Sequence, residues 1–147
     1  MPLKRFQTFH DVFVLVEKAQ TKKEKVAILR EHSCAALKAV LGYTYDPNVK
    51  WMLPAGVPPY TPLPAGADQE GRLVSEVRKF YLFVDGPTET QKNISSARRE
   101  KLFIEMLEVV DPNDAKVLLG MKDRRLPYRG LTRKLVAEAF PTISKNW

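Results

Sequence analysis

Residues 95–122, "SSARREKLFIEMLEVVDPNDAKVLLGMK", carry the clearest structural pattern in the chain. Five apolar residues recur there at three- and four-residue spacing, which places them on one stripe of a helix. They are Leu102, Phe103, Met106, Leu107 and Val110. The Asp-Pro step that follows predicts a second helix, because Asp111 is a good N-cap and Pro112 suits the first helical position. Two adjoining helices of this kind favour an all-α fold.

The same periodicity extends outward in both directions. It predicts helices over 9–20, 21–32, 33–41, 68–84 and 130–141, with a turn at 85–93. Thr21 and Glu24 have the spacing of a capping box, and Gly42 is expected to end the third helix. No strand pattern and no internal repeat is evident. We therefore predict a compact domain of six or seven helices that occupies residues 1–147.

A proline-rich stretch interrupts this pattern. Six prolines lie between Pro47 and Pro64, which excludes regular helix over most of the segment. We predict a long surface loop over residues 46–66, held down by Trp51, Met52, Leu53 and Tyr60.

Composition limits the function classes. The 147 residues are 44% hydrophobic and 28% charged, with a net charge of +7 and a pI of about 9.6. This balance favours an acidic partner, either nucleic acid, an anionic membrane or an acidic protein. The single cysteine, Cys34, makes no internal disulfide and is expected to pack in the core, which favours a reducing, cytoplasmic compartment. No apolar run is long enough to span a bilayer, and the N-terminus does not read as a secretory signal.

Catalytic signatures are missing from the sequence. It has no glycine-rich phosphate loop and no His-Glu-x-x-His motif. His10 and His32 have no Cys or His neighbours at metal-ligand spacing. We therefore expect no enzyme activity, no cofactor and no metal.

Basic residues concentrate near the C-terminus. Residues 116–134 contain seven lysines and arginines against Asp123 alone, a net charge of +6. They flank the entrance of the last predicted helix, where unpaired N–H groups favour an anion such as phosphate. The predicted phosphate contacts are Lys122, Arg124, Arg125, Arg129, Gly130, Thr132, Arg133 and Lys134. The alternative is an ordinary solvated helix cap.

Aromatic residues beside the proline-rich stretch also allow two interpretations. Tyr43, Tyr45 and Trp51 lie close to Lys50, a combination that can stack single-stranded bases. The favoured interpretation is that they anchor the loop to the core.

Three segments, taken in order, resemble a known family. They are residues 17–54, "EKAQTKKEKVAILREHSCAALKAVLGYTYDPNVKWMLP"; residues 99–122, "REKLFIEMLEVVDPNDAKVLLGMK"; and residues 123–141, "DRRLPYRGLTRKLVAEAFP". Together they resemble the N-terminal helical DNA-binding domain of ATP-dependent DNA ligases, above all the bacteriophage type. In the last segment Gly130, Phe140 and Pro141 match a helix that begins at glycine and closes with an aromatic residue and proline.

The resemblance covers about Val12 to Ile143 and implies a partner. Ligase domains of this type grip the backbone of nicked duplex DNA with little sequence preference, and they also contact other replication proteins. The chain lacks the Lys-x-Asp-Gly nucleophile motif and ends at Trp147, before the place of a nucleotidyltransferase domain, so no nick sealing is expected. "RRLPYRG" also departs from the family's more regular helix opening.

Two functions follow as hypotheses. The first is a non-catalytic accessory protein of phage type that binds double-stranded or nicked DNA through phosphates, with Lys92, Arg98 and Arg99 as further contacts. The alternative is a protein–protein interaction module that docks on a phage or host replication, transcription or virion component. Its candidate surfaces are the proline-rich loop and an acidic helix face at Glu100, Glu105 and Glu108.

Overall fold

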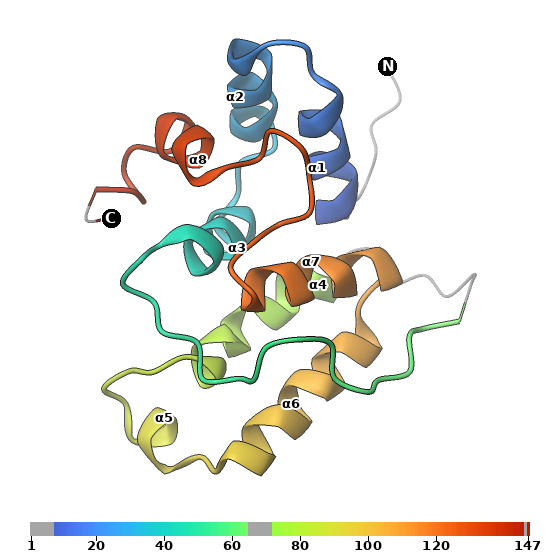
Figure 1. Cartoon of the computed structure of the whole chain (residues 1–147), viewed down its shortest axis with the longest axis vertical. Coiled ribbons are helices and arrows are strands. Elements are labelled where there is room, and N and C mark those ends of the chain that lie inside the picture. Colours follow the sequence, from blue (N-terminus) through green and yellow to red (C-terminus); the bar gives the residue numbers. More distant parts are fainter. Residues whose placement is uncertain (1–7, 65–71, 146) are drawn as a thin grey trace.

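The computed structural model describes residues 8–64, 72–145 and 147, and this part of the chain is helical (Figure 1). Its only β pairing is a single antiparallel bridge between Trp51 and Val84. The predicted all-α class is therefore confirmed. The helices are α1 (Phe9–Lys18), α2 (Lys22–Glu31), α3 (Ala35–Tyr45), α4 (Arg72–Glu76), the 3₁₀ helix η1 (Val77–Phe83), α5 (Glu89–Asn93), α6 (Ser96–Val109), α7 (Pro112–Lys122) and α8 (Arg133–Ala139).

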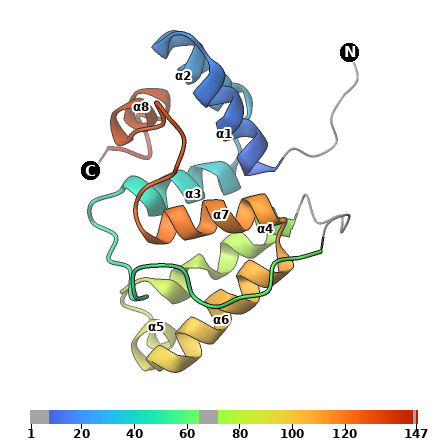
Figure 2. The ribbon, with the colours of Figure 1, turned by 45° about the vertical axis from the view of Figure 1, so that its right-hand side comes forward.

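Helix α7 lies at the centre of the molecule. It packs against α1, α3 and α6, and Val117, Leu118 and Met121 are fully buried. Its start is the predicted one, because the Asp111 side chain accepts a hydrogen bond from the Asn113 N–H and Pro112 is at the first turn. Figures 1 and 2 place α1, α2 and α8 at one end of the molecule and α4, α5 and α6 at the other, with α3 and α7 between them.

The apolar stripes predicted for two helices face the core. In α1 the buried residues are Phe9, Val12, Phe13 and Val16. In the α6 stripe Phe103, Met106, Leu107 and Val110 are buried and Leu102 is partly buried. Both stripes pack into the hydrophobic core around α7. The spacing of apolar residues predicted them because a helix that packs on a core has one apolar face.

The third helix differs from its prediction at both ends. It begins after Cys34, whose Sγ accepts a hydrogen bond from the Leu37 N–H at 3.4 Å, and it continues through Gly42 to Tyr45. Cys34 is exposed, so its predicted place in the core is wrong. Gly42 does not end the helix, because the extra turn is stabilised by tertiary contacts. Thr44 is buried there, and the Tyr43 ring packs edge-on against Phe80.

The segment between α3 and α6 contains more helix than predicted. The expected helix 68–84 is α4 followed by η1, and its residues 68–71 lie outside the described part of the chain. The expected turn at 85–93 contains the short helix α5, which opens with a capping box between Thr88 and Gln91. The described chain therefore has eight α-helices and η1 instead of six or seven helices.

The proline-rich segment runs over α6 and α7 without helix from residue 46 to 64, and residues 65 and 66 lie outside the described part. The indole N–H of Trp51 donates to the Tyr43 carbonyl at 2.9 Å, and the Met52 N–H donates to the Phe83 carbonyl at 2.9 Å. The Tyr45 hydroxyl donates to the Leu131 carbonyl at 3.0 Å. These contacts support anchoring, not base stacking, as the role of the aromatic residues.

Candidate nucleic-acid interface

Two of the predicted phosphate contacts point into the protein. Lys122 is 4% exposed, and its Nζ donates to the Pro54 carbonyl at 2.9 Å and pairs with the Asp123 carboxylate at 2.6 Å. Arg124 has a φ of 65° and donates through Nη2 to the Asp46 carbonyl at 2.6 Å and through Nη1 to the Val49 carbonyl. The burial of Lys122 contradicts its prediction as a phosphate contact, whereas Arg124 is half-buried and donates both Nη groups to the proline-rich segment.

A second group of predicted contacts is exposed. Arg125, Arg129, Arg133 and Lys134 all face solvent, and no ion pair engages any of them among the residues that the structure describes. Arg125 follows the end of α7, Arg129 lies in the connecting segment, and Arg133 and Lys134 form the first turn of α8. These four side chains keep their full positive charge available to a partner.

The backbone of Gly130 lies close to the Lys25 side chain of α2. Its φ is 84°, a conformation that favours glycine, and a Cβ built there would lie 3.0 Å from Cε of Lys25. The glycine therefore makes room for the Lys25 side chain, whereas the sequence had suggested room for a phosphate.

Thr132 is the N-cap of α8. Its Oγ1 accepts a hydrogen bond from the Leu135 N–H at 3.2 Å, which leaves the hydroxyl hydrogen free to donate outward. Because the cap fills part of this helix end and α8 has seven residues, side-chain charge must contribute more to anion binding than the helix terminus.

Helix α2 adds cations that the sequence analysis did not assign to this surface. Lys22 pairs with Glu138 of α8 at 2.8 Å, and Lys23 is exposed. An open groove of about 210 Å³ runs between the two helices and is lined by Lys22, Lys25, Gly130, Thr132, Lys134 and Leu135. The run "TKKEK" at the start of α2 was the available signal, but only the packing of α2 on α8 brings it beside the C-terminal basic residues.

Two further cations at this end are structural. Lys25 donates from Nζ to the carbonyls of Val16 and Ala19, at 2.7 and 2.9 Å, and so caps the C-terminus of α1. Arg30 donates from Nε to the Ala139 carbonyl at 3.0 Å and caps α8 in the same way. A cation at a helix C-terminus also offsets the partial negative charge there.

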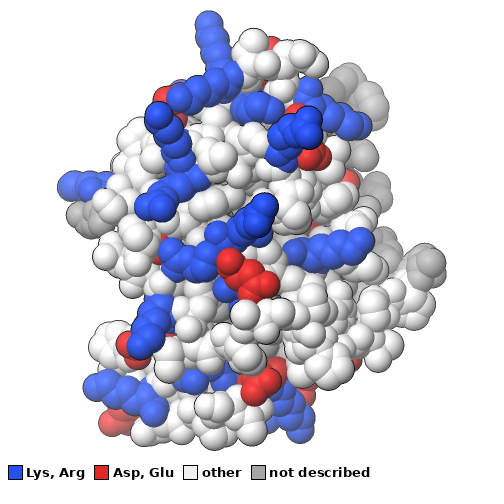
Figure 3. All heavy atoms as spheres, in the orientation of Figure 1, with Lys and Arg blue, Asp and Glu red and all other residues white. Residues whose placement is uncertain are grey.

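We define the basic surface as Lys22, Lys23, Arg129, Arg133 and Lys134. Figure 3 shows lysine and arginine side chains over the whole of this face, including the half that carries α2, α8 and the segment before α8. Three carboxylates lie nearby. Glu138 pairs with Lys22, Glu17 accepts through Oε2 from the Arg129 N–H at 2.9 Å, and Glu24 lies in the first turn of α2. The surface therefore has an excess of positive charge.

The auxiliary contacts predicted at the other end do not join this surface. Arg99 is 5% exposed and donates from Nε to the Leu82 carbonyl at 2.9 Å and from Nη2 to the Gln91 carbonyl at 3.0 Å. Lys92 and Arg98 are exposed on α5 and α6, which Figures 1 and 2 place at the opposite end from α2 and α8.

A buried polar cluster connects α1, α7 and the segment before α8. Asp114 is 1% exposed and accepts from the His10 N–H at 3.1 Å, while the His10 Nδ1 and the Tyr128 hydroxyl share a hydrogen bond of 2.8 Å. Burial raises the pKa of Asp114 to about 7, and the charges of Asp111 and Asp11 add to that rise. Burial also raises the pKa of Tyr128. The cluster connects α1, α7 and the segment before α8, and so has a structural role. No sequence pattern predicted it.

The described residues offer neither a metal cluster nor a membrane-spanning helix. No group of three or more His, Cys, Asp or Glu side chains there is placed to hold a metal ion. Across the same residues, none of the helices combines the length and apolar composition that crossing a bilayer requires.

The fold and this surface define a class, a small helical protein with a basic face at one end. The chain belongs to the Family of unknown function (DUF6433), whose model matches residues 12–128. That match begins within α1, includes α2 through α7 and ends one residue before Arg129. Comparison with curated proteins and with solved structures gives no match.

Proposed function

We propose that this protein binds duplex or nicked DNA through the phosphate backbone, without catalysis and with little sequence preference. The observation that carries the proposal is the group of exposed cations Arg129, Arg133 and Lys134, without ion pairs in the described structure, beside the lysines of α2. Each phosphate that such a side chain neutralises releases counterions, so binding would weaken steeply with salt. Phosphate contacts position a protein and carry little base information.

The resemblance to phage-type ligase DNA-binding domains supports the same proposal. It rests on the order of the three sequence segments and on the glycine-led final helix, and it motivates the phage type, the cytoplasmic location and the role beside replication proteins. Arg125 completes the proposed contact set, in place of the inward-facing Lys122 and Arg124.

A mobility-shift assay tests the proposal. The protein is titrated into nicked, intact and single-stranded DNA at two salt concentrations. We expect the triple variant R129Q/R133Q/K134Q to bind duplex at least about tenfold more weakly and to lower the log–log salt slope by about 3, one for each lost contact.

The matched control is K92Q/R98Q/K101Q, which removes the same charge from α5 and α6. It should bind like the wild type, and both variants should keep the helical circular dichroism spectrum. If both variants bind DNA equally weakly, the loss of affinity depends on net charge and not on the position of the cations. Wild-type binding by the first variant would remove the basic surface from the proposal.

A second function is favoured by the exposed apolar side chains of the proline-rich segment. Val57 is 70% exposed and Met52 is 39% exposed, and burial of both against a partner would be favourable. A protein-docking module would retain its partner after nuclease treatment and would show no counterion-release slope. V57S/M52Q would then reduce partner retention and leave DNA binding unchanged.

A further inference from the structure

One ion pair on the basic surface lies between two open grooves. The groove of about 210 Å³ beside the start of α8 has Lys22 in its wall, and so has a second groove of about 480 Å³. The second groove is lined by Lys22, Lys23, Val26, Ala27, Arg30 and Glu138. Because Nζ of Lys22 lies 2.8 Å from Oε1 of Glu138, the pair connects α2 to α8 at the wall that the two grooves share.

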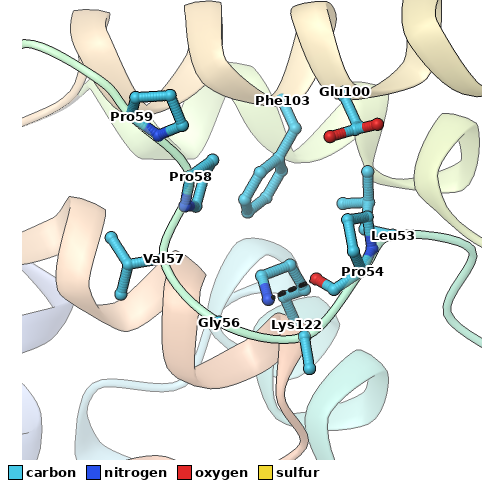
Figure 4. A pocket seen from close by; sticks show the side chains of 10 residues that line it. Leu53, Pro54, Gly56, Val57, Pro58, Pro59, Glu100, Phe103 and Lys122 are labelled. Carbon is cyan, nitrogen blue, oxygen red and sulfur yellow. Dashed lines mark hydrogen bonds between the residues drawn. The ribbon is translucent and has the colours of Figure 1, made fainter.

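Both members of this pair are open to solvent. The Lys22 side chain is 51% exposed and the Glu138 side chain is 53% exposed, so a phosphate oxygen can reach the ammonium. Lys122 is the contrast, because its side chain is 2% exposed and its Nζ donates to the Pro54 carbonyl (Figure 4). An ion pair as exposed as that of Lys22 contributes little to stability, so another anion can replace its carboxylate at small cost.

The pairing of Lys22 decides the charge of the smaller groove. Lys25 also lines that groove, but its ammonium donates to three backbone carbonyls at the end of α1. Lys134 lines it without an ion pair in the described part of the chain. Lys134 and Glu138 are four residues apart on α8 and are therefore neighbours on one helix face. A phosphate that displaces Glu138 from Lys22 would thus lie close to the Lys134 ammonium as well.

We propose that Glu138 occupies Lys22 in the free protein and that a backbone phosphate of DNA displaces it, so that Glu138 lowers the DNA affinity of the basic surface. This inference rests on the proposed DNA binding. The phosphate takes the place of the carboxylate at Nζ, and the freed carboxylate turns to solvent. The packing of α2 on α8 survives the exchange, because Arg30 holds α8 through the backbone carbonyls of Glu138 and Ala139, at 3.2 and 3.0 Å.

The exchange has a signature in the salt dependence of binding. A lysine that neutralises a phosphate releases about one counterion from the DNA. In the wild type the freed Glu138 carboxylate remains beside the DNA and retains a cation, so Lys22 adds little to the net release. Without that carboxylate the contact of Lys22 counts in full. Removal of the Glu138 charge should therefore steepen the log–log salt slope by about 1.

Mobility shifts with intact duplex at several salt concentrations test the exchange. E138Q should bind about two- to fivefold more tightly than the wild type, the range that an exposed ion pair allows. The matched control is E24Q, which removes the same charge from an exposed position two residues from Lys22. A glutamine at position 24 can still accept from the Thr21 hydroxyl. E24Q should keep the wild-type slope and gain less than half as much affinity as E138Q.

The comparison of K22Q/E138Q with K22Q shows whether the gain passes through Lys22. The ratio of their affinities should fall to that of E24Q over the wild type. An equal gain in E138Q and E24Q, or a gain of E138Q that persists in the K22Q background, overturns the exchange and leaves DNA binding itself intact. A wild-type protein that does not bind duplex overturns the proposed function and this inference together.

Discussion

Two groups of basic residues near the C-terminus, Lys122 with Arg124 and Arg129 with Arg133 and Lys134, have different environments in the folded protein. Lys122 and Arg124 donate to carbonyl groups of the proline-rich segment, while Arg129, Arg133 and Lys134 face solvent. The reason lies in the acceptors. A proline-rich segment has few N–H groups and forms no regular ladder, so its carbonyls need donors from elsewhere. Cations that lie close to such a segment become part of the structure.

The same use of cations recurs across the molecule. Lys25 and Arg30 cap helix C-termini, and Arg99 satisfies two buried carbonyls. With Lys122 and Arg124, five positive side chains serve internal carbonyl groups. The net charge of +7 therefore does not show which cations can contact a nucleic acid directly, and the exposed cations without internal partners define the candidate interface.

The largest expected effect is the difference in unfolding free energy between a variant of a buried cation and a variant of an exposed one. K122M should lower the free energy of unfolding by about 3 kcal/mol, since it removes two hydrogen bonds of a buried ammonium, to the Pro54 carbonyl and to the Asp123 carboxylate. K134M, the matched exposed change, should stay within about 0.5 kcal/mol. Urea denaturation measures both, and equal losses would abolish the distinction between inward and outward cations.

The buried acid Asp114 extends the comparison to negative charge. Its folded pKa of about 7 lies above the ordinary value of 3.8, so the folded state binds the proton more tightly than the unfolded state. The contribution of this group to stability is present below pH 4 and is lost as pH rises to 7. Relative to wild type, D114N should therefore gain about 3 kcal/mol between pH 4 and pH 7. A difference that does not change with pH would contradict the raised pKa.

Two glycines, Gly130 and Gly42, differ in whether their backbone conformation requires glycine. Gly130 has a φ of 84° and lies against Lys25, so G130A should cost about 1–2 kcal/mol. Gly42 lies within α3, and a Cβ there would meet nothing within 4 Å, so G42A should stabilise the protein by about 0.5–1 kcal/mol. Thermal unfolding of the two variants should shift in opposite directions. A stabilising G130A would show that the segment before α8 relaxes freely.

The smallest expected effect on stability belongs to the exposed cations. R133Q should change the unfolding free energy by less than about 0.5 kcal/mol and lower the salt slope of DNA binding by about 1. R98Q, an exposed arginine on α6, is its matched control and should leave the slope unchanged. An unaltered slope in both variants would place Arg133 outside the DNA contact.

Much of the fold was predictable because its signals are local. The apolar stripes of α1 and α6, and the Asp111–Pro112 start of α7, depend on residues within one or two turns of each other. The errors occurred where distant contacts outweighed local preference. Gly42 continues α3 because Tyr43 and Thr44 pack into the core, and α5 forms although its five residues have no stripe to reveal it.

The candidate interface was predictable only in part. Its position near the start of α8 and the residues Arg129, Arg133 and Lys134 follow from the charge run at 116–134. The inward turn of Lys122 and Arg124 was not predictable, because it depends on carbonyls at positions 46–54, some 70 residues away. Neither was the contribution of α2, which required its packing on α8.

The sequence by itself determined the helical class and the sum of the charge, because hydrophobic periodicity and composition are properties of the chain before it folds. Tertiary structure decided which cations remain free. A guanidinium or ammonium that lies beside an unsatisfied carbonyl donates to it. The position of that carbonyl is fixed only when segments distant in the chain come together.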